Sequence, residues 1–256
     1  MTNDSRPLIL YADGKEVADG CRIRVQGRSN MTLFPDCYIV SIYNVSSQDA
    51  SRISNARRIT VTGEDNSVFC YGEIADRYLH TSDLAAVTSL TIADGKTFWE
   101  TTVAKSVGAG STVRSAINAI KGSCQFGAFI ADDVKMLRGQ TFVGRLADQI
   151  SVMAKTLGAR AFFTHGMIHI VKPGQAANIV TIPESDLLDE SSTADGILIL
   201  KTKVKGYPVG VIASYGRRRY RLIAQAINAD NWSGLWQAEL MLLDETLLGP
   251  DEMGGG

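Results

Sequence analysis

Three histidines are the first candidates for acid–base catalysis or metal binding. His165 and His169 are four residues apart, a spacing that would place both imidazoles on one face of a helix and make a metal pair. Two apolar runs flank His165-Gly166, and this context predicts a tight hairpin in which the glycine supplies the positive φ. The two side chains then lie on a turn and on the following strand. His80 stands alone near a predicted loop, and we assign none of the three a ligand role.

No other catalytic signature is found in the sequence. There is no Walker loop, no Gly-x-Ser-x-Gly elbow and no His-Glu-x-x-His pair. Gly108-Ala109-Gly110 lacks the Gly-Lys-Ser/Thr continuation of a phosphate-binding turn and indicates a flexible linker. Asp94 and Asp132-Asp133 lie near turns, without a second cluster that would complete an acid–base pair. We therefore predict a non-enzymatic protein with no catalytic residues, no metal site and no cofactor.

Four cysteines, Cys21, Cys37, Cys70 and Cys124, are widely spaced, and no two form a Cys-x-x-Cys pair. In a reducing compartment such residues are mostly small buried hydrophobic side chains. We expect that role here, with metal or disulfide roles as the alternatives.

A few surface residues are candidates for contact with a partner. The basic run Arg217-Arg218-Arg219-Tyr220-Arg221 could bind nucleic acid or an acidic protein. The plainer interpretation is a hairpin tip that leads into a strand with its arginines toward solvent. The overall charge is balanced, so a protein partner is favoured over DNA. The remaining interface candidates are Trp232 in a predicted turn and Leu247 and Leu248 in the C-terminal tail.

Composition agrees with an ordinary globular chain. The 256 residues (27.7 kDa) are 45% hydrophobic and 21% charged, with a net charge of −1 and a pI near 6.3. This balance does not indicate specific nucleic-acid binding. No apolar run approaches the ~18–20 residues needed to cross a bilayer. The first residues carry acid and no apolar stretch, so we expect no signal peptide and synthesis in the cytoplasm.

The residues that would position any site are predicted mainly as strands. Residues 23–25, 38–43 and 58–62 are rich in β-branched and aromatic residues, and turn formers lie between them. Such short, regularly spaced strands suggest a sandwich or a barrel. After Pro173-Gly174 the chain returns to predicted strands at 197–204, 209–215, 219–229 and 236–244.

The middle of the chain changes to helical periodicity. Val113, Ala116, Ile117 and Ile120 predict a helix over 112–121, with Ser111 or Thr112 as N-cap and Gly122 as the C-terminal stop. Apolar residues at helical spacing from Val143 to Leu157 predict a second helix. With the hairpin that follows it, this stretch predicts a small α/β unit over 108–173.

Two polar or aperiodic segments are expected to be arms. Residues 184–195 are acidic and serine-rich without strand alternation, which predicts an exposed loop. Residues 247–256 have no periodicity. Neither segment has enough apolar surface to offset the entropy of ordering. We expect both to become ordered only against a partner.

Three groups of segments together resemble the baseplate hub family of tailed phages, which includes the late-control protein D type. The first is a strand ending in aromatic-Asn. The second has the pattern of the hub's small α/β domain, and the third looks like the closing hairpin of a hub barrel. The segments are Met31–Asn44, Ile59–Gly63 and Tyr71–Ile74; Asp94–Trp99, Thr112–Ile117, Phe142–Asp148 and Leu157–Phe162; and Tyr220–Ala226, Asn228–Gly234 and Trp236–Leu240.

The resemblance implies a mainly β fold with an α/β insert. Its expected parts are a first tube-like β-barrel domain (1–92), a small α/β domain (93–173), a second β-barrel domain (174–246) and a tail (247–256). It also implies a homotrimeric ring that adapts a hexameric tail tube to a threefold central spike. The implied partners are the tail tube protein, the spike or tail-tip protein, the tape measure protein and other baseplate proteins. The implied location is the tail baseplate of a virion, with no membrane partner.

Two other classes of function remain as alternatives. A tail-tip adaptor or carbohydrate-binding module would expose clustered aromatics. Trp232 and Trp236 are the only candidates, and the pattern predicts Trp236 in the core of a strand. A tail-associated cell-wall hydrolase would need paired carboxylates, a Cys/His pair or zinc ligands, and we find none.

Overall fold

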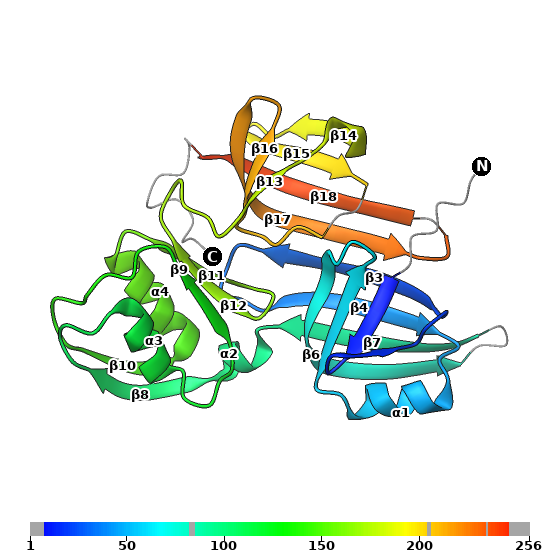
Figure 1. The fold of residues 1–256 in the computed structure, drawn as a ribbon, viewed down its shortest axis with the longest axis horizontal. Coiled ribbons are helices and arrows are strands. Elements are labelled where there is room, and N and C mark those ends of the chain that lie inside the picture. Colours follow the sequence, from blue (N-terminus) through cyan, green and yellow to red (C-terminus); the bar gives the residue numbers. More distant parts are fainter. Residues whose placement is uncertain (1–7, 82–84, 204–205, 234, 246–256) are drawn as a thin grey trace.

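The computed structural model describes residues 8–81, 85–203, 206–233 and 235–245. Its strands and helices form a long β body with a compact α/β unit at one end (Figure 1). The predicted fold class, mainly β with an α/β insert, is confirmed.

The N-terminal part of the β body alternates buried and exposed side chains, as the period-two pattern predicts. In β4, for example, Tyr38, Val40 and Ile42 point into the core while Cys37 and Ile39 face outward. The elements are β1 (Leu8–Ala12), β2 (Lys15–Val17), β3 (Arg22–Asn30), β4 (Asp36–Tyr43), α1 (Ser47–Asn55), β5 (Arg58–Gly63), β6 (Val68–Thr81) and β7 (Ala86–Asp94).

The α/β unit, hereafter the insert, follows directly from β7 and has its own hydrophobic core. Its elements are α2 (Lys96–Glu100), β8 (Thr102–Val107), α3 (Val113–Ile120), β9 (Gly127–Ile130), β10 (Gln140–Arg145), α4 (Leu146–Thr156), β11 (Arg160–Thr164) and β12 (Met167–Val171). The C-terminal part contains β13 (Ile179–Thr181), the 3-10 turn Glu184–Asp186, β14 (Leu187–Ser192), β15 (Ile197–Thr202), β16 (Ile212–Tyr215), β17 (Arg218–Asp230) and β18 (Leu235–Asp244).

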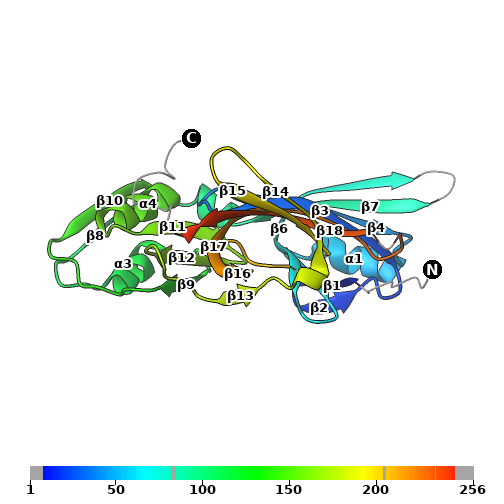
Figure 2. The ribbon, with the colours of Figure 1, turned by 90° about the horizontal axis from the view of Figure 1, so that it is seen from above.

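One sheet runs through both the N-terminal and the C-terminal parts. Its strand order is β14-β15-β18-β17-β3-β4-β7-β6-β5-β1-β2, with β16 also pairing β17 and β13 pairing β16. Strands β17 and β3 join the two parts over seven register pairs, from Ala224–Asn30 to Asp230–Arg24. A single hydrophobic core lies beneath it, on the side where Figure 2 shows α1, β1, β2, β13 and β16. The division of the β body into two barrels at the predicted boundaries stays a prediction.

The sheet contains the same strand arrangement twice. The first half-sheet has the spatial order β3-β4-β7-β6, so its third and fourth strands along the chain exchange places in the sheet. The second half-sheet has the spatial order β14-β15-β18-β17, with the same exchange of its third and fourth strands. Each half-sheet also pairs its third strand with one further strand, β5 on β6 and β16 on β17. The eight-strand run is therefore a topological repeat of one four-strand unit.

The insert's helices begin and end largely where the sequence predicts. Thr112 caps α3, its hydroxyl accepting the N–H of Ser115 at 3.2 Å, and Gly122 follows with φ +58°. The second helix is shorter than predicted. Val143 lies in strand β10 opposite Ala104 and is 64% exposed, because β8 and β10 form a two-stranded sheet ahead of the helix. The hairpin prediction is confirmed by the antiparallel pairing of β11 with β12.

The predicted loop at 184–195 is wrong, because β14 pairs with β15 over most of that stretch. All but the first residue of β14 are exposed, so burial imposes no alternation on its sequence. Backbone pairing with β15 makes it a strand, helped by Leu187 against the core and by the hydrogen bond from the Tyr215 hydroxyl to Glu190. The predicted strand at 197–204 ends at Thr202, and that at 209–215 starts only at Ile212. Val204 and the tail 247–256 lie outside the described residues.

Ile150 tests the insert's core. It is fully buried on α4 in the same cluster as Ile117, Ile120 and the hairpin residues Phe163 and Ile168. Replacing it by Ala removes apolar contacts and leaves a cavity, which costs about 2–5 kcal/mol of unfolding free energy. The matched control is Lys155→Ala on the exposed side of the same helix. Denaturant unfolding should show the loss for Ile150→Ala only, and equal stability of the two variants would contradict this packing.

Candidate assembly surfaces and the insert junction

The histidines are placed as turn and strand residues. His165 occupies the β11–β12 turn with φ +48°, and His169 lies in β12 with its ring stacked 4.8 Å from that of Phe162. Burial lowers the pKa of each to about 4, so both imidazoles are neutral at pH 7. Among the residues that the structure describes, no three His, Cys, Asp or Glu side chains are grouped to hold a metal ion.

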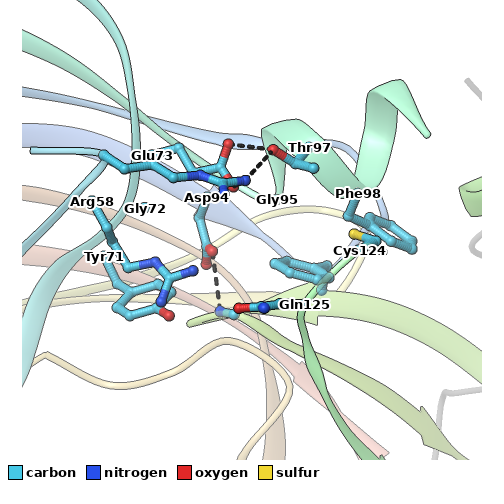
Figure 3. Close-up of a pocket in the computed structure, with 13 residues that line it drawn as sticks. Arg58, Tyr71, Gly72, Glu73, Asp94, Gly95, Thr97, Phe98, Cys124 and Gln125 are labelled. Carbon is cyan, nitrogen blue, oxygen red and sulfur yellow. Dashed lines mark hydrogen bonds and ion pairs between the residues drawn. The ribbon is translucent and has the colours of Figure 1, made fainter. Parts of the chain in front are cut away.

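The insert meets the β body at a small pocket, hereafter the junction pocket (Figure 3). Arg58, Tyr71 and Glu73 come from the β body, Thr97 and Phe98 from α2, and Asp94 and Gly95 from the connection between them. The cavity measures about 30 Å³. That space suits one or two water molecules, not a substrate. The pocket is therefore a junction between two structural units.

Polar contacts across the junction pocket hold the insert in place. The Asp94 carboxylate accepts the backbone N–H of Gly166 at 3.1 Å, from the tip of the β11–β12 hairpin. Glu73 accepts a hydrogen bond from the Thr97 hydroxyl and forms an ion pair with Arg57 at 3.5 Å. Gly166 has φ +72°, and a Cβ there would lie 2.7 Å from the Tyr71 ring. Close approach and backbone conformation both require glycine at this position.

The insert is also held at two points away from the junction pocket. The N–H of Phe163 donates to the carbonyl of Thr32 at 2.9 Å, in the loop between β3 and β4. In the same loop, the Phe34 ring lies 4.4 Å from that of Trp99, and the Arg145 guanidinium lies 4.3 Å from the Trp99 ring. This aromatic and cation–π packing ties α2 and β10 to the β body.

Two buried carboxylates lie opposite one another where β4 begins and β7 ends. Asp36 and Asp94 are register partners, 4% and 2% exposed. Burial raises the pKa of Asp36 to about 8. The hydrogen bond from the Asn30 N–H lowers this pKa, and the nearby charge of Asp94 raises it further. Burial likewise raises the pKa of Asp94 to about 7, against the N–H groups of Gly166 and His165. The sequence analysis named Asp94 only as a carboxylate near a turn and missed its pairing with Asp36, because an Asp before a Gly or after a Pro looks like a turn residue.

The sequence-predicted interface residues do not form one surface. Arg217, Arg218 and Arg219 are exposed at the tip of the β16–β17 hairpin, as expected. Trp232 is 70% exposed and lies two residues beyond the opposite end of β17. The 13 residues of β17 separate these two sites by ~40 Å at the usual rise per residue. Leu247 and Leu248 lie outside the described residues.

Arg221 is the exception in the basic run, because it is buried rather than facing solvent. It forms an ion pair with Glu245 and donates to the carbonyls of Gly210 (2.6 Å) and Gln175 (2.9 Å). A fully buried charge requires such partners. This residue therefore fixes the chain segments around β17 and is unavailable to a partner molecule.

Trp232 separates two surface hollows at one end of the β body. One, of about 310 Å³, is lined by Cys21, Arg22 and Tyr43 among others, and the second, of about 250 Å³, by residues of β1 and β2. Beneath them Arg22 and Asp230 form an ion pair at 2.5 Å. Trp236, in contrast, is half-buried and packs edge-on against Phe69 at 5.6 Å.

The cysteines only partly follow the prediction. Cys70 and Cys124 are buried and Cys21 is half-buried, but Cys37 is exposed on the outward face of β4. All four are free thiols. Strand alternation explains Cys37, because its neighbours Asp36 and Tyr38 take the inward positions.

The two ends of the eight-strand run from β14 to β6 are unpaired edges that the sequence did not reveal. β14 pairs only with β15, and beyond Ile74 β6 pairs only with β7 among the described residues. The β6–β7 hairpin projects from the body, with Tyr78 64% and Leu79 66% exposed (Figures 1 and 2). Unpaired edges with apolar side chains are templates for pairing with another chain.

The comparisons with known proteins give the fold. No family model matches the chain, and no curated protein does. Among solved structures, the tail protein from Neisseria meningitidis MC58 is 11% identical with a TM-score of 0.66, over 96% of this chain and 98% of that one. A tail protein of prophage MuSo2 from Shewanella oneidensis is 9% identical with a TM-score of 0.68, over 94% and 97%.

A third similar structure is the E. coli c3393 protein, a component of the type VI secretion system described as similar to the T4 bacteriophage tail proteins gp27 and gp5. It is 10% identical with a TM-score of 0.64, over 92% of this chain and 76% of that one. These likenesses show a shared fold. In the part of the chain that the structure describes, no helix is long and apolar enough to cross a membrane.

The buried carboxylates predict a specific pH dependence. Folded Asp36 and Asp94 stay protonated up to pKa values of about 8 and 7, whereas unfolded ones ionise near 3.8. Folding therefore takes up protons in this range, and stability falls as pH rises, by about 1.4 kcal/mol per unit for each proton. His165 and His169, lowered from 6.5 to about 4, oppose this slope only below 6.5. The fall should be clearest between pH 6.5 and 8.

Asp36→Asn isolates one of these protons. The amide oxygen can still accept the Asn30 N–H, and the buried charge is removed. The melting temperature of the variant should rise relative to wild type as pH increases from 6.5 to 8.5 at constant ionic strength. Asp195→Asn, in an exposed turn, is the control, and its melting temperature should differ from that of the wild type by the same amount at every pH. A constant difference between Asp36→Asn and wild type over this range would show that Asp36 is not protonated in the fold.

Proposed function

We propose that this chain is the baseplate hub protein of a phage-type tail, a structural protein that forms a homotrimeric ring between the hexameric tail tube and the threefold central spike. The observation that carries the proposal is the doubled strand arrangement in each subunit. Three copies bring together six similar half-sheets. A ring built this way offers six near-equivalent positions to a hexameric tube and three full repeats to a spike.

Comparison of folds supports the same function. The similar solved structures include tail proteins of Neisseria meningitidis and of a Shewanella oneidensis prophage, aligned over nearly their whole length. The c3393 protein links the fold to gp27 and gp5 of the T4 tail. The partners of this chain would then be the tail tube protein, the spike or tail-tip protein, the tape measure protein and other baseplate proteins, all within the virion tail.

The geometry of the sheet favours a ring over a paired dimer. The two ends of the eight-strand run from β14 to β6 belong to different strands, β14 and the part of β6 beyond Ile74. Contact between unlike surfaces is head-to-tail, and such contacts close into a ring when the rotation between copies allows it. The outward face of the first half-sheet carries polar side chains such as Arg24, Gln26 and Ser41 beside Ile39, which is 52% exposed. In the proposed ring this face forms the wall of the channel.

A structural function also agrees with the site chemistry. The junction pocket is too small for a substrate, and its carboxylates serve the contact between the insert and the β body. A hydrolase function is favoured by no observation in the described residues. The alternative of a tail-tip adaptor or carbohydrate-binding module has one supporting observation, the exposed Trp232 between two hollows of about 310 and 250 Å³.

Oligomeric state separates these functions. Under the proposal, mass photometry should find a species of three times the 27.7 kDa subunit mass, alone or with the tube and spike proteins added. Trp232→Ala should leave this trimer unchanged. A protein that stays monomeric even with its neighbours, and whose tryptophan fluorescence is quenched by cell-wall glycan only when Trp232 is present, would contradict the proposal and favour the carbohydrate-binding alternative.

A further inference from the structure

The internal joint between the two half-sheets gives a template for a contact between copies. β17 is divided by an irregularity between Leu222 and Ala224. Before it, residues 218–221 pair with β16, and from Ala224 on the strand pairs with β3 of the other half-sheet. The third strand of one unit is thus joined to the first strand of the next.

β6, the third strand of the first half-sheet, has the same division. Its register with β7 shifts between Ile74 and Asp76, just as that of β17 with β18 shifts between Leu222 and Ala224. Before the shift β6 pairs with β5. The residues after it, Asp76–Thr81, hereafter the β6 extension, have no strand partner on that edge within the described residues, although the Arg77 side chain donates to the carbonyl of Ala56 at 2.7 Å. The position that β3 fills beside β17 is therefore empty beside the β6 extension.

β14 is the strand equivalent to β3, and it is the one whose edge is free. Each is the first strand of its half-sheet and pairs with the second, β14 with β15 and β3 with β4. β3 pairs with β17 on its other edge. β14 has no second partner among the described strands. Within one subunit the two free edges are separated by seven strand spacings, ~34 Å at the usual ~4.8 Å, so they cannot pair with each other.

Apolar side chains on both free edges are exposed in the isolated subunit. Leu79 on the β6 extension is 66% exposed, and its equivalent after the shift in β17, Ile227, is 3% exposed beneath the joint with β3. On β14, Leu188 is 49% exposed, and it lies outside the three residues of β14 that the register below places opposite Leu79, His80 and Thr81. Pairing of the two edges would bury backbone and apolar surface together, as it does at the internal joint.

The repeat also fixes the register of such a contact. Ala224 and Asp76 are the first paired residues after the two shifts, so they are equivalent, as are Asn228 and His80 four residues later. The same equivalence can be followed across each half-sheet. In the second, Ala224 lies opposite Met241, Met241 opposite Ile199 and Ile199 opposite Ser191. In the first, Asp76 lies opposite Thr91, Thr91 opposite Ile39 and Ile39 opposite Gln26, so Ser191 of β14 is equivalent to Gln26 of β3. At the internal joint Asn228 lies opposite Gln26.

We infer that the β6 extension of one copy pairs antiparallel with β14 of the next copy, with His80 opposite Ser191. The neighbouring pairs are Leu79 with Ser192 and Thr81 with Glu190. This inference rests on the proposed ring and specifies its contact. Each joint between copies then repeats the register of the joint inside a copy, and the eight-strand run continues from one copy to the next around the ring.

Disulfide cross-linking tests the register. His80→Cys and Ser191→Cys are introduced together in a Cys37→Ser background, which removes the exposed native thiol. Opposite residues in antiparallel strands have Cβ atoms about 4.5–5.5 Å apart, within reach of a disulfide after small adjustment. Mild oxidation should give covalent dimers and trimers on a non-reducing gel. The control His80→Cys with Glu190→Cys places the thiols on opposite faces and should give no cross-link.

A second measurement separates this inference from the proposed function. Mass photometry under reducing conditions reports the trimer without the disulfide. A trimer that gives no cross-link, or one that cross-links equally through Glu190→Cys, would overturn the inferred contact and leave the hub proposal standing. A protein that is monomeric by mass photometry and forms no cross-link would overturn both.

Substitution of the apolar residue gives an independent readout. Leu79→Glu should raise the concentration at which the trimer half-dissociates by about tenfold or more, the size expected for losing one buried leucine. Leu137→Glu is the matched control, since Leu137 is 95% exposed in the insert, away from both edges. The melting temperature of the monomer should be unchanged in both variants. Equal trimer stability in the two variants would contradict burial of Leu79 between copies.

Discussion

Backbone pairing between β17 and β3 is the interaction on which the rest of this structure depends. Seven register pairs join strands that are about 200 residues apart in the chain. Side chains reinforce the joint at one end, where Arg22 pairs with Asp230 and the N–H of Ile23 donates to the Asn231 side chain at 2.8 Å. Without this joint there would be two separate four-strand units, each with one more exposed edge. With it, the subunit has one sheet and one core beneath it.

The insert lies between the two half-sheets along the chain and at one end of the β body in space, and its contacts tie it to both. The chain leaves the first half-sheet at Asp94, and the same carboxylate accepts an N–H from the returning hairpin at Gly166. On the other side, the Phe162 ring packs so closely on Gly210 that any Cβ there would overlap it. The insert is thus held by both parts of the β body, which suits a spacer of fixed orientation in an assembly.

Sequence patterns predicted the features that burial controls. Alternation gave β4 and β5, and helical spacing gave α3 with Thr112 as its cap. The patterns failed where the structure does not follow from the burial of local apolar side chains. β14 is a strand mainly through backbone pairing with β15, and Arg221 in a basic run is buried because three distant segments supply its partners. The long-range β17–β3 joint leaves no local trace in either strand, so the doubled half-sheet became visible only in the structure.

Electron microscopy of the intact tail with this protein labelled tests the central claim most directly. The account predicts three copies of the chain in a single ring, at the end of the tube where sixfold symmetry changes to threefold. Within that ring the density should show six half-sheets in one continuous wall. Copies repeated along the length of the tube, or label found only at a peripheral position without threefold symmetry, would contradict it.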